Sequence, residues 1–255
     1  LETFSISPGD NYSAHTKIGA KNDLDKLTLE LVNNYVSKLK QYPTPKRVAA
    51  KSREIYYKIH KDEKPLLENF DSAILDWFSI EYQIFKILEN KIYKEKVKKS
   101  FDDLNSLHKF ANTAMEKRKT RVKNSFKYHL EYIFNTIELP FKSTGKNNNE
   151  KNIDFAFFNT KGVPSIFLNS QVSCKNSWES TINLASGMEE NFLITLEKGL
   201  SERICEQIDE HNITLVVPEK YCVYYPKQYR EKLLTISKFC SLAKEKIQKA
   251  ILLHN

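Results

Sequence analysis

The segment from Ile153 to Trp178, IDFAFFNTKGVPSIFLNSQVSCKNSW, constrains the fold of this chain more than any other. Its first six residues are apolar except for Asp154, and residues 165–174 form a second run long enough for a buried strand. Asn159 to Gly162 have the composition of a turn. The segment therefore predicts two strands joined by a turn.

Two charged residues stand at the ends of these predicted strands. Asp154 lies near the start of the first strand, and Lys175 directly follows the second. The two side chains can meet at one end of a sheet. A carboxylate that binds Mg²⁺ and a cation beside the scissile phosphate are what a metal-dependent nuclease needs. At this point a solvated Asp and Lys on an ordinary hairpin explain the segment equally well.

The size and charge of the chain narrow the choice of partner. Its 255 residues suit one large domain, or a core with a helical extension. The formal net charge of +8 favours a polyanionic partner, nucleic acid first and an anionic membrane surface second. A basic charge that serves only solubility is the alternative. No apolar run approaches the roughly 20 residues that cross a bilayer. No predicted helix has a clean basic face opposite a bulky apolar one, so a membrane surface is the weakest choice and we expect no membrane partner.

The four cysteines, Cys174, Cys205, Cys222 and Cys240, indicate the compartment. No two of them have the C-x₂-C spacing, so we expect no structural zinc site. A chain of this length without close cysteine pairs is typical of a cytoplasmic protein with reduced thiols. The polar N-terminus also lacks the apolar stretch of a signal peptide.

The first 95 residues predict a polar arm followed by a helical subdomain. Apolar residues recur at helical spacing in three segments, residues 24–39, 45–59 and 66–93. Trp77, in the third segment, is most simply a core residue, although stacking on a nucleic-acid base is an alternative.

The chain becomes basic from residue 96 onward. An amphipathic helix is predicted over residues 100–115, and five cations follow within seven residues, Lys117 to Lys123. Such a cluster, directly followed by a core helix over residues 125–137, favours phosphate contact over a merely solvated helix face. The residues that we expect to hold the DNA backbone are Lys117, Arg118, Lys119 and Arg121. His129, within the core helix, is predicted to be an interior histidine.

The remaining elements define the fold class. After a loop over residues 142–151 and the two strands, we predict helices over 177–187, 201–211 and 226–253, with strands over 191–196 and 213–217. This order predicts an α/β core with a mixed central sheet flanked by helices. The predicted division is an N-terminal all-helical extension, residues 1–95, and a core, residues 96–255.

Several short motifs occur in order along the second part of the chain. They are Arg118-Lys-Thr-Arg121, Ser125-Phe-Lys-Tyr-His129-Leu-Glu131, Asp154-Phe155, Val172-Ser-Cys-Lys175-x-x-Trp178, Phe192-Leu-Ile-Thr-Leu-x-x-Gly199, Leu215-Val-Val-Pro218 and Tyr225-Pro226. Over about residues 80–240 this set resembles the C-terminal catalytic domain of the EcoRII restriction endonuclease and its relatives, including PspGI. The resemblance implies a prokaryotic enzyme with the PD-(D/E)XK nuclease fold, Mg²⁺-dependent cleavage of double-stranded DNA and a homodimer.

The resemblance also implies roles for individual residues. Asp154 would be the metal carboxylate, Lys175 the catalytic lysine near water and phosphate, and Glu131 the upstream acid. Ser173 stands where the usual acid precedes the lysine by two positions. Glu189, fourteen residues after the lysine, is the candidate that would make up for this loss as a catalytic and metal-binding acid.

Two departures from the family pattern concern the target sequence and the site charge. Where relatives that read GG-containing sites carry arginines after the lysine, this chain has Asn176, Ser177, Trp178 and Glu179. Arginine is the usual partner of guanine, whereas Asn suits adenine and Glu can accept from cytosine, so we expect a different target. Gln171 also replaces a lysine of the relatives, which removes a positive charge near the site.

We therefore expect a type II restriction endonuclease that acts at a short palindromic sequence. A repair or recombination nuclease of the same fold is one alternative, because it would cut by DNA structure and not by sequence. A DNA-binding module without enzymatic activity, in which Asp154 and Lys175 only stabilise the end of a sheet, is the other.

Overall fold

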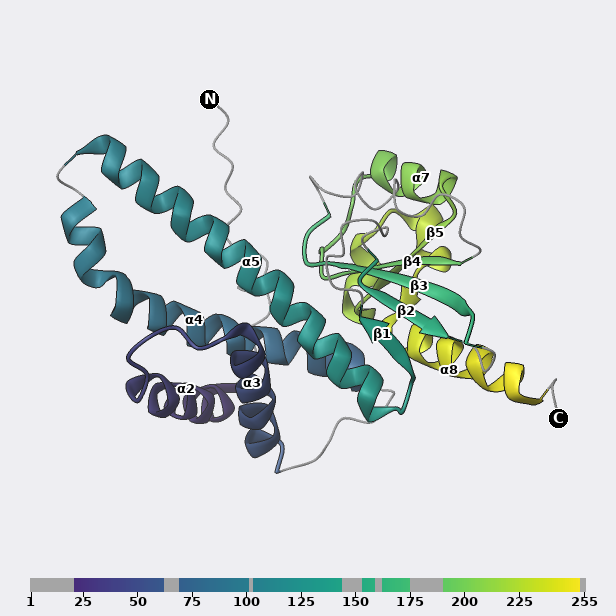
Figure 1. Cartoon of the computed structure of the whole chain (residues 1–255), viewed down its shortest axis with the longest axis horizontal. Coiled ribbons are helices and arrows are strands. Elements are labelled where there is room, and N and C mark those ends of the chain that lie inside the picture. The colour runs from purple at the N-terminus through teal and green to yellow at the C-terminus, as the bar shows by residue number, and fades with distance from the viewer. Residues whose placement is uncertain are drawn as a thin grey trace. The chain divides into compact units, whose positions relative to one another are not determined.

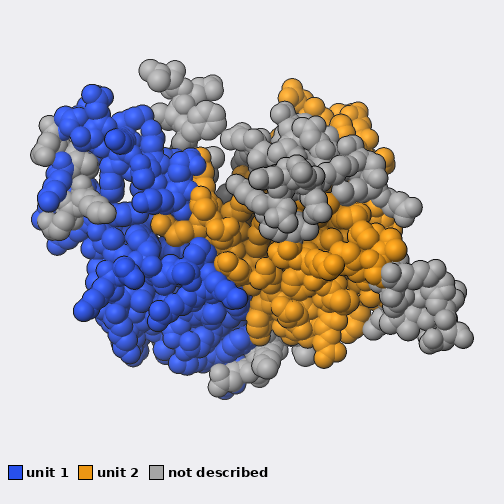
Figure 2. Space-filling model, viewed as in Figure 1, with its two compact units in different colours: residues 1–64, 76–118 blue, residues 65–75, 119–255 orange. Residues whose placement is uncertain are grey.

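The computed structural model describes residues 21–61, 69–100, 103–143, 153–158, 162–174 and 190–252. The chain divides into two compact units, residues 1–64 with 76–118 and residues 65–75 with 119–255 (Figures 1 and 2). Two long helices therefore contribute to both units. The functional boundary near residue 95 stays a prediction. Among the described residues, no helix is long and apolar enough to cross a membrane.

The first unit is built from helices, so the predicted N-terminal helical extension is confirmed. The third predicted helix starts in the second unit and extends to Ser100. The helix over residues 45–59 begins where the sequence predicts, because Thr44 caps it and Pro45 occupies its first turn. The helices of this unit are α2 (Lys21–Ser37), α3 (Pro45–Ile59), most of α4 (Phe70–Ser100) and the first part of α5 (Leu104–Thr136).

Trp77 lies in the core of the first unit. Its side chain is fully buried, and its ring meets that of Tyr56 edge-on with centroids 6.1 Å apart. The guanidinium carbon of Arg53 lies 5.9 Å from the indole centroid. The core interpretation is therefore confirmed, because a ring enclosed in this way is not accessible for base stacking.

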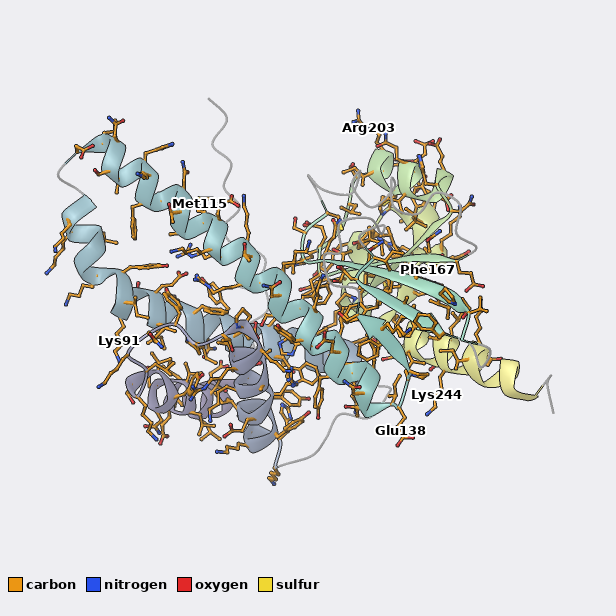
Figure 3. All side chains as sticks on the ribbon, in the orientation of Figure 1. Lys91, Met115, Glu138, Phe167, Arg203 and Lys244 are labelled. Carbon is orange, nitrogen blue, oxygen red and sulfur yellow. The ribbon has the colours of Figure 1, made fainter. Side chains whose placement is uncertain are left out.

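Lys91 of α4 caps the C-terminal end of α2 (Figure 3). Its ammonium donates to the carbonyl oxygens of Val36, Ser37 and Leu39 at 3.2, 3.0 and 2.8 Å. The last carbonyls of a helix lack partners within the helix and carry partial negative charge, so a cation there is stabilising. This side chain ties α2 to α4.

The second unit contains a mixed six-stranded sheet in the order β1-β2-β3-β4-β5-β6. The first three strands are antiparallel, and β3 to β6 are parallel, which confirms the predicted mixed sheet. The strands are β1 (Phe141–Ser143), β2 (Phe155–Phe158), β3 (Pro164–Gln171), β4 (Asn191–Thr195), β5 (Ile213–Val217) and β6 (Leu234–Thr235).

Helices cover both faces of this sheet, as predicted. On one face, Phe134 of α5 packs edge-on against Phe155 and Phe157, with centroids 5.3 and 5.0 Å apart, and Phe239 of α8 (Ile236–Leu252) adds to the cluster. On the other face, Cys205 and Ile208 of α7 (Glu202–Glu210) pack with apolar residues of β4 and β5. Figure 1 shows α7 and α8 on opposite sides of the strands.

Two predicted helices are a single helix. The predicted segments 100–115 and 125–137 merge into α5, and the basic cluster lies within it. No glycine or proline interrupts this stretch, and Lys and Arg are good helix formers, so nothing local ends the first segment.

The closing helix begins later than predicted. Residues 227–232 form a 3₁₀ helix, β6 follows, and α8 starts only at Ile236. Its start is fixed by Asp71, whose carboxylate accepts the backbone N–H groups of Ile236 and Ser237 at 2.8 and 3.0 Å. Thr235 adds a local cap, because its Oγ1 accepts the backbone N–H of Lys238 at 3.2 Å, whereas the contribution of the distant Asp71 leaves no local pattern in the sequence. Strand β1 also occupies the start of the predicted loop over residues 142–151, and the predicted helix 177–187 lies outside the described residues.

Candidate active site

Asp154 lies in a bend directly before β2, and β3 holds its carboxylate. Oδ2 accepts a hydrogen bond from the backbone N of Ser170 at 2.8 Å and another from its hydroxyl at 2.7 Å. The backbone N of Asp154 donates to Oδ1 of Asn169 at 3.3 Å. The pairing of Phe155 with Leu168 puts Asp154 opposite Asn169, so the strand register itself brings these groups together.

The other oxygen of Asp154, Oδ1, forms an ion pair with Lys127 of α5. The two side chains are 24% and 13% exposed, so the pair is largely enclosed. The sequence analysis missed Lys127, because an isolated lysine one turn after a basic cluster carries no distinguishing pattern. Ser170 therefore binds Oδ2 of Asp154, and the ammonium of Lys127 neutralises the charge at Oδ1.

Glu131 lies on α5, four residues after Lys127, and is partly buried. Residues four apart share one side of a helix, so Glu131 is on the side of α5 that carries the partner of Asp154. His129 is fully buried, which agrees with its interpretation as an interior histidine.

A second carboxylate lies where β3 and β4 end. The hydroxyl of Ser173 donates to Oε2 of Glu197 at 2.6 Å, and Glu197 is only 1% exposed. The parallel register pairs Gln171 with Thr195, and two more residues on each strand bring Ser173 beside Glu197. The sequence analysis missed Glu197, although it stands inside the quoted Leu-x-x-Gly199 motif.

The backbone of Glu197 is fixed on both sides of the residue. Its N–H donates to Oγ1 of Thr195 at 3.0 Å, and its carbonyl accepts from the Tyr225 hydroxyl at 3.0 Å and the Gly199 N–H at 2.9 Å. Burial raises the pKa of Tyr225, which keeps its hydroxyl a donor. Gly199 has φ +95°, and an added Cβ would lie 2.7 Å from the carbonyl oxygen of Tyr224. Only glycine fits this turn.

Cys174 is not a nucleophile at neutral pH. The pKa of its thiol is raised to about 12, chiefly by burial; a hydrogen bond with Thr195 lowers it and the charge of Glu197 raises it. The thiol is therefore protonated.

Several predicted site residues lie outside the described part of the chain: Lys175, Asn176, Ser177, Trp178, Glu179 and Glu189. Their neighbour Glu190 is described. It forms an ion pair with Lys246, and its carbonyl accepts the backbone N–H of Phe167 at 3.1 Å. Glu190 thus precedes β4, at the end of that strand opposite to Glu197.

The residues that were predicted to contact the DNA backbone lie in the middle of α5. Lys117 and Lys119 are exposed, and Arg121 is partly buried. Arg118 makes a two-pronged contact with Glu89, in which its Nε lies 2.9 and 2.7 Å from the two carboxylate oxygens. Hydrogen bonding to Glu89 raises the pKa of Arg118. This arginine therefore has a structural partner that the sequence analysis did not foresee.

The chemistry of Asp154 fits a hard divalent cation. Carboxylate oxygens are the ligands that Mg²⁺ prefers, and it commonly uses one or two of them together with water and substrate phosphate. Within the described residues, no three His, Cys, Asp or Glu side chains converge on one point. A cage built wholly from protein ligands therefore has no support in this part of the chain.

A known family matches most of the second unit and the end of α4. The family model described as EcoRII C terminal matches residues 85–240, more than half of the chain. The chain belongs to this family. The type II restriction enzyme EcoRII of Escherichia coli is 27% identical over 178 residues, which cover 66% of this chain and 44% of that enzyme. The chain thus spans less than half of the length of this relative.

Solved structures show the same fold. Metal-depleted Ecl18kI in complex with uncleaved, modified DNA has a TM-score of 0.68 at 16% identity, over 89% of this chain and 85% of that one. The complex of restriction endonuclease PspGI with substrate DNA has a TM-score of 0.63 at 12% identity, over 81% and 94%. The first match exceeds the range of the family model, so part of the helical region before residue 85 also has a counterpart. The predicted restriction-endonuclease-like core is confirmed.

Proposed function

We propose that this chain is a type II restriction endonuclease that hydrolyses phosphodiester bonds of double-stranded DNA. The observation that carries the proposal is Asp154, which two antiparallel strands hold at the end of the sheet while a lysine neutralises one of its oxygens. Family membership supports the same activity, and the basic charge of the chain suits a polyanionic substrate.

The proposed cofactor is Mg²⁺, held by Asp154 and a second carboxylate. The chemistry that Mg²⁺ would supply there is polarisation of the scissile phosphate and a lower pKa of a bound water molecule. Lys175 stabilises the negative charge that develops on the phosphate and orients the attacking water. By family resemblance, Glu131 and Glu189 are candidates for the second carboxylate.

The proposed DNA contacts are of two kinds. Lys117 and Lys119 are exposed on α5 and suit phosphate contacts, with Arg121 nearby on the same helix. Arg118 belongs to the same predicted set, but its guanidinium already contacts Glu89 of α4. To contact DNA, it must either bind a phosphate in addition to Glu89 or release Glu89. The residues Asn176, Ser177, Trp178 and Glu179 are proposed to read base edges.

A homodimer would apply two such sites to a palindromic target, one to each strand. A cytoplasmic location in a prokaryotic cell agrees with this function.

Digestion of sequenced phage and plasmid DNA with Mg²⁺, followed by mapping of the ends, tests the proposal. Discrete, reproducible fragments with a shared sequence at their ends are expected, and Lys175→Ala should abolish them while DNA binding remains. A smear, or cutting confined to junctions, would mean a repair or recombination nuclease. If the wild type cuts no DNA across a broad range of metals and pH, the chain is a binding module.

A further inference from the structure

The proposed nuclease site has a serine, Ser173, at a position where a carboxylate is expected. Ser173 precedes Lys175 by two positions, where the family resemblance leads one to expect a carboxylate beside that of Asp154. A serine hydroxyl carries no charge and is a poor substitute for a carboxylate as a ligand of Mg²⁺. Another acid must therefore bring its charge to the position of the Ser173 side chain.

Glu197 brings a carboxylate to this position. Its Oε2 lies 2.6 Å from the hydroxyl of Ser173, so the two side chains are within one hydrogen bond of each other. We propose that Glu197 is the second carboxylate ligand of the metal, in place of the acid that Ser173 replaces. This inference rests on the proposed function, because it assigns a further residue to the same site.

The burial of Glu197 suits a residue that binds a cation. Glu197 is 1% exposed, so little water surrounds its carboxylate. Electrostatic interactions are stronger where water is excluded, so a cation that reaches this carboxylate interacts with it more strongly than with an acid on the surface.

The rigid backbone around Glu197 suits a metal ligand. Three hydrogen bonds to Thr195, Gly199 and Tyr225 fix its N–H and carbonyl groups, so its side chain starts from a defined place. Metal ligands need such support, because small displacements weaken coordination. Asp154 is anchored to Ser170 and Glu197 to Ser173, so both acids are held by the last residues of β3 and the segment that directly follows.

Glu190 provides the contrast. It precedes β4, whereas Glu197 follows it, and its carboxylate is paired with Lys246 of α8. An acid at that end of the strand is separated from Glu197 by the length of β4, which five residues extend to roughly 16 Å.

The test measures metal binding directly, with Mn²⁺ and Ca²⁺ as the probes, by calorimetry on the full chain bound to a duplex that carries the mapped target. Ca²⁺ serves to keep the duplex intact during the titration. Glu197→Gln should weaken Mn²⁺ and Ca²⁺ binding at least tenfold, whereas binding of the duplex without metal should not change. The matched control Glu190→Gln removes a partly exposed acid from the other end of β4 and should leave metal affinity unaltered.

A second variant separates coordination from stability. Adding Ser173→Asp to Glu197→Gln returns a carboxylate to the position two before Lys175, and it should restore metal affinity to within a few-fold of the wild type. Unchanged metal affinity in a folded Glu197→Gln variant overturns the proposal, and so does a double variant that folds but binds metal no better than the single one. Failure of the proposed function would appear elsewhere, as a wild type that cuts no DNA.

Discussion

Asp71 and Asp154, both in the second unit, hold partners of different kinds. Asp71, at the start of α4, accepts three backbone N–H groups, from Glu219, Ile236 and Ser237, together with the Ser237 hydroxyl. Asp154 accepts one backbone N–H and one hydroxyl, both from Ser170, and pairs with the ammonium of Lys127.

This difference separates a structural acid from one available for chemistry. Backbone donors cannot leave Asp71 without unwinding the start of α8, so its charge is committed to the fold. A lysine side chain can rotate away from Asp154 at little cost to the backbone. An acid whose charged partner is a side chain, and not the backbone of a helix, can exchange that partner for a metal ion.

The largest effect is expected from Asp154→Asn. The substitution keeps an acceptor for Ser170 but removes the charge that holds the metal, so the cleavage rate should fall about 1,000-fold. Single-turnover cleavage of a mapped duplex measures the loss, and a DNA-binding assay without metal checks that the variant still binds. A variant that cuts as fast as the wild type would remove Asp154 from the catalytic site.

The second largest effect is a loss of stability, expected from Asp71→Asn. Three N–H donors would face a neutral and partly mismatched amide, so the free energy of unfolding should fall by about 2 kcal/mol. Thermal unfolding should show this as a lower melting temperature, by roughly 4–8 °C for a chain of this size. Cleavage per folded molecule should not change. A catalytic defect without a loss of stability would break the distinction between the two acids.

The smallest effect is expected from Lys127→Met. Removing the ammonium leaves Asp154 without its competing cation, so the metal concentration for half-maximal cleavage should fall about threefold. Lys127→Arg, which keeps the charge, is the matched control and should stay near the wild type. If Lys127→Met instead needs more metal or stops cutting, Lys127 acts on the substrate phosphate and does not compete with metal.

The sequence predicts those elements whose ends carry local signals. Thr44 and Pro45 mark the start of α3, and Pro218 marks the end of β5, and both elements lie where they were predicted. The start of α8 was predicted too early, because its local cap, Thr235, was overlooked and its other acceptor, Asp71, lies in a different helix. The continuity of α5 was missed because a charged run was taken for a break.

The same reasoning explains what the sequence tells of the site. Asp154 was singled out because it interrupts an apolar run. Lys127 and Glu197 were not, because each is recognisable only by its partner on a neighbouring element. Strand register and helix packing create those pairs, and neither can be read from a single sequence without its fold.

Helix α5 also fixes the distance between two lysines in the second unit. Lys119 and Lys127 lie on one uninterrupted helix, whose rise of 1.5 Å per residue sets them about 12 Å apart along its axis. A loop between them would let this spacing drift, whereas a helix fixes it. A DNA strand gripped at Lys119 would thus meet the Asp154 carboxylate at a distance set by helix geometry, and the length of α5 would help to choose which phosphate is cut.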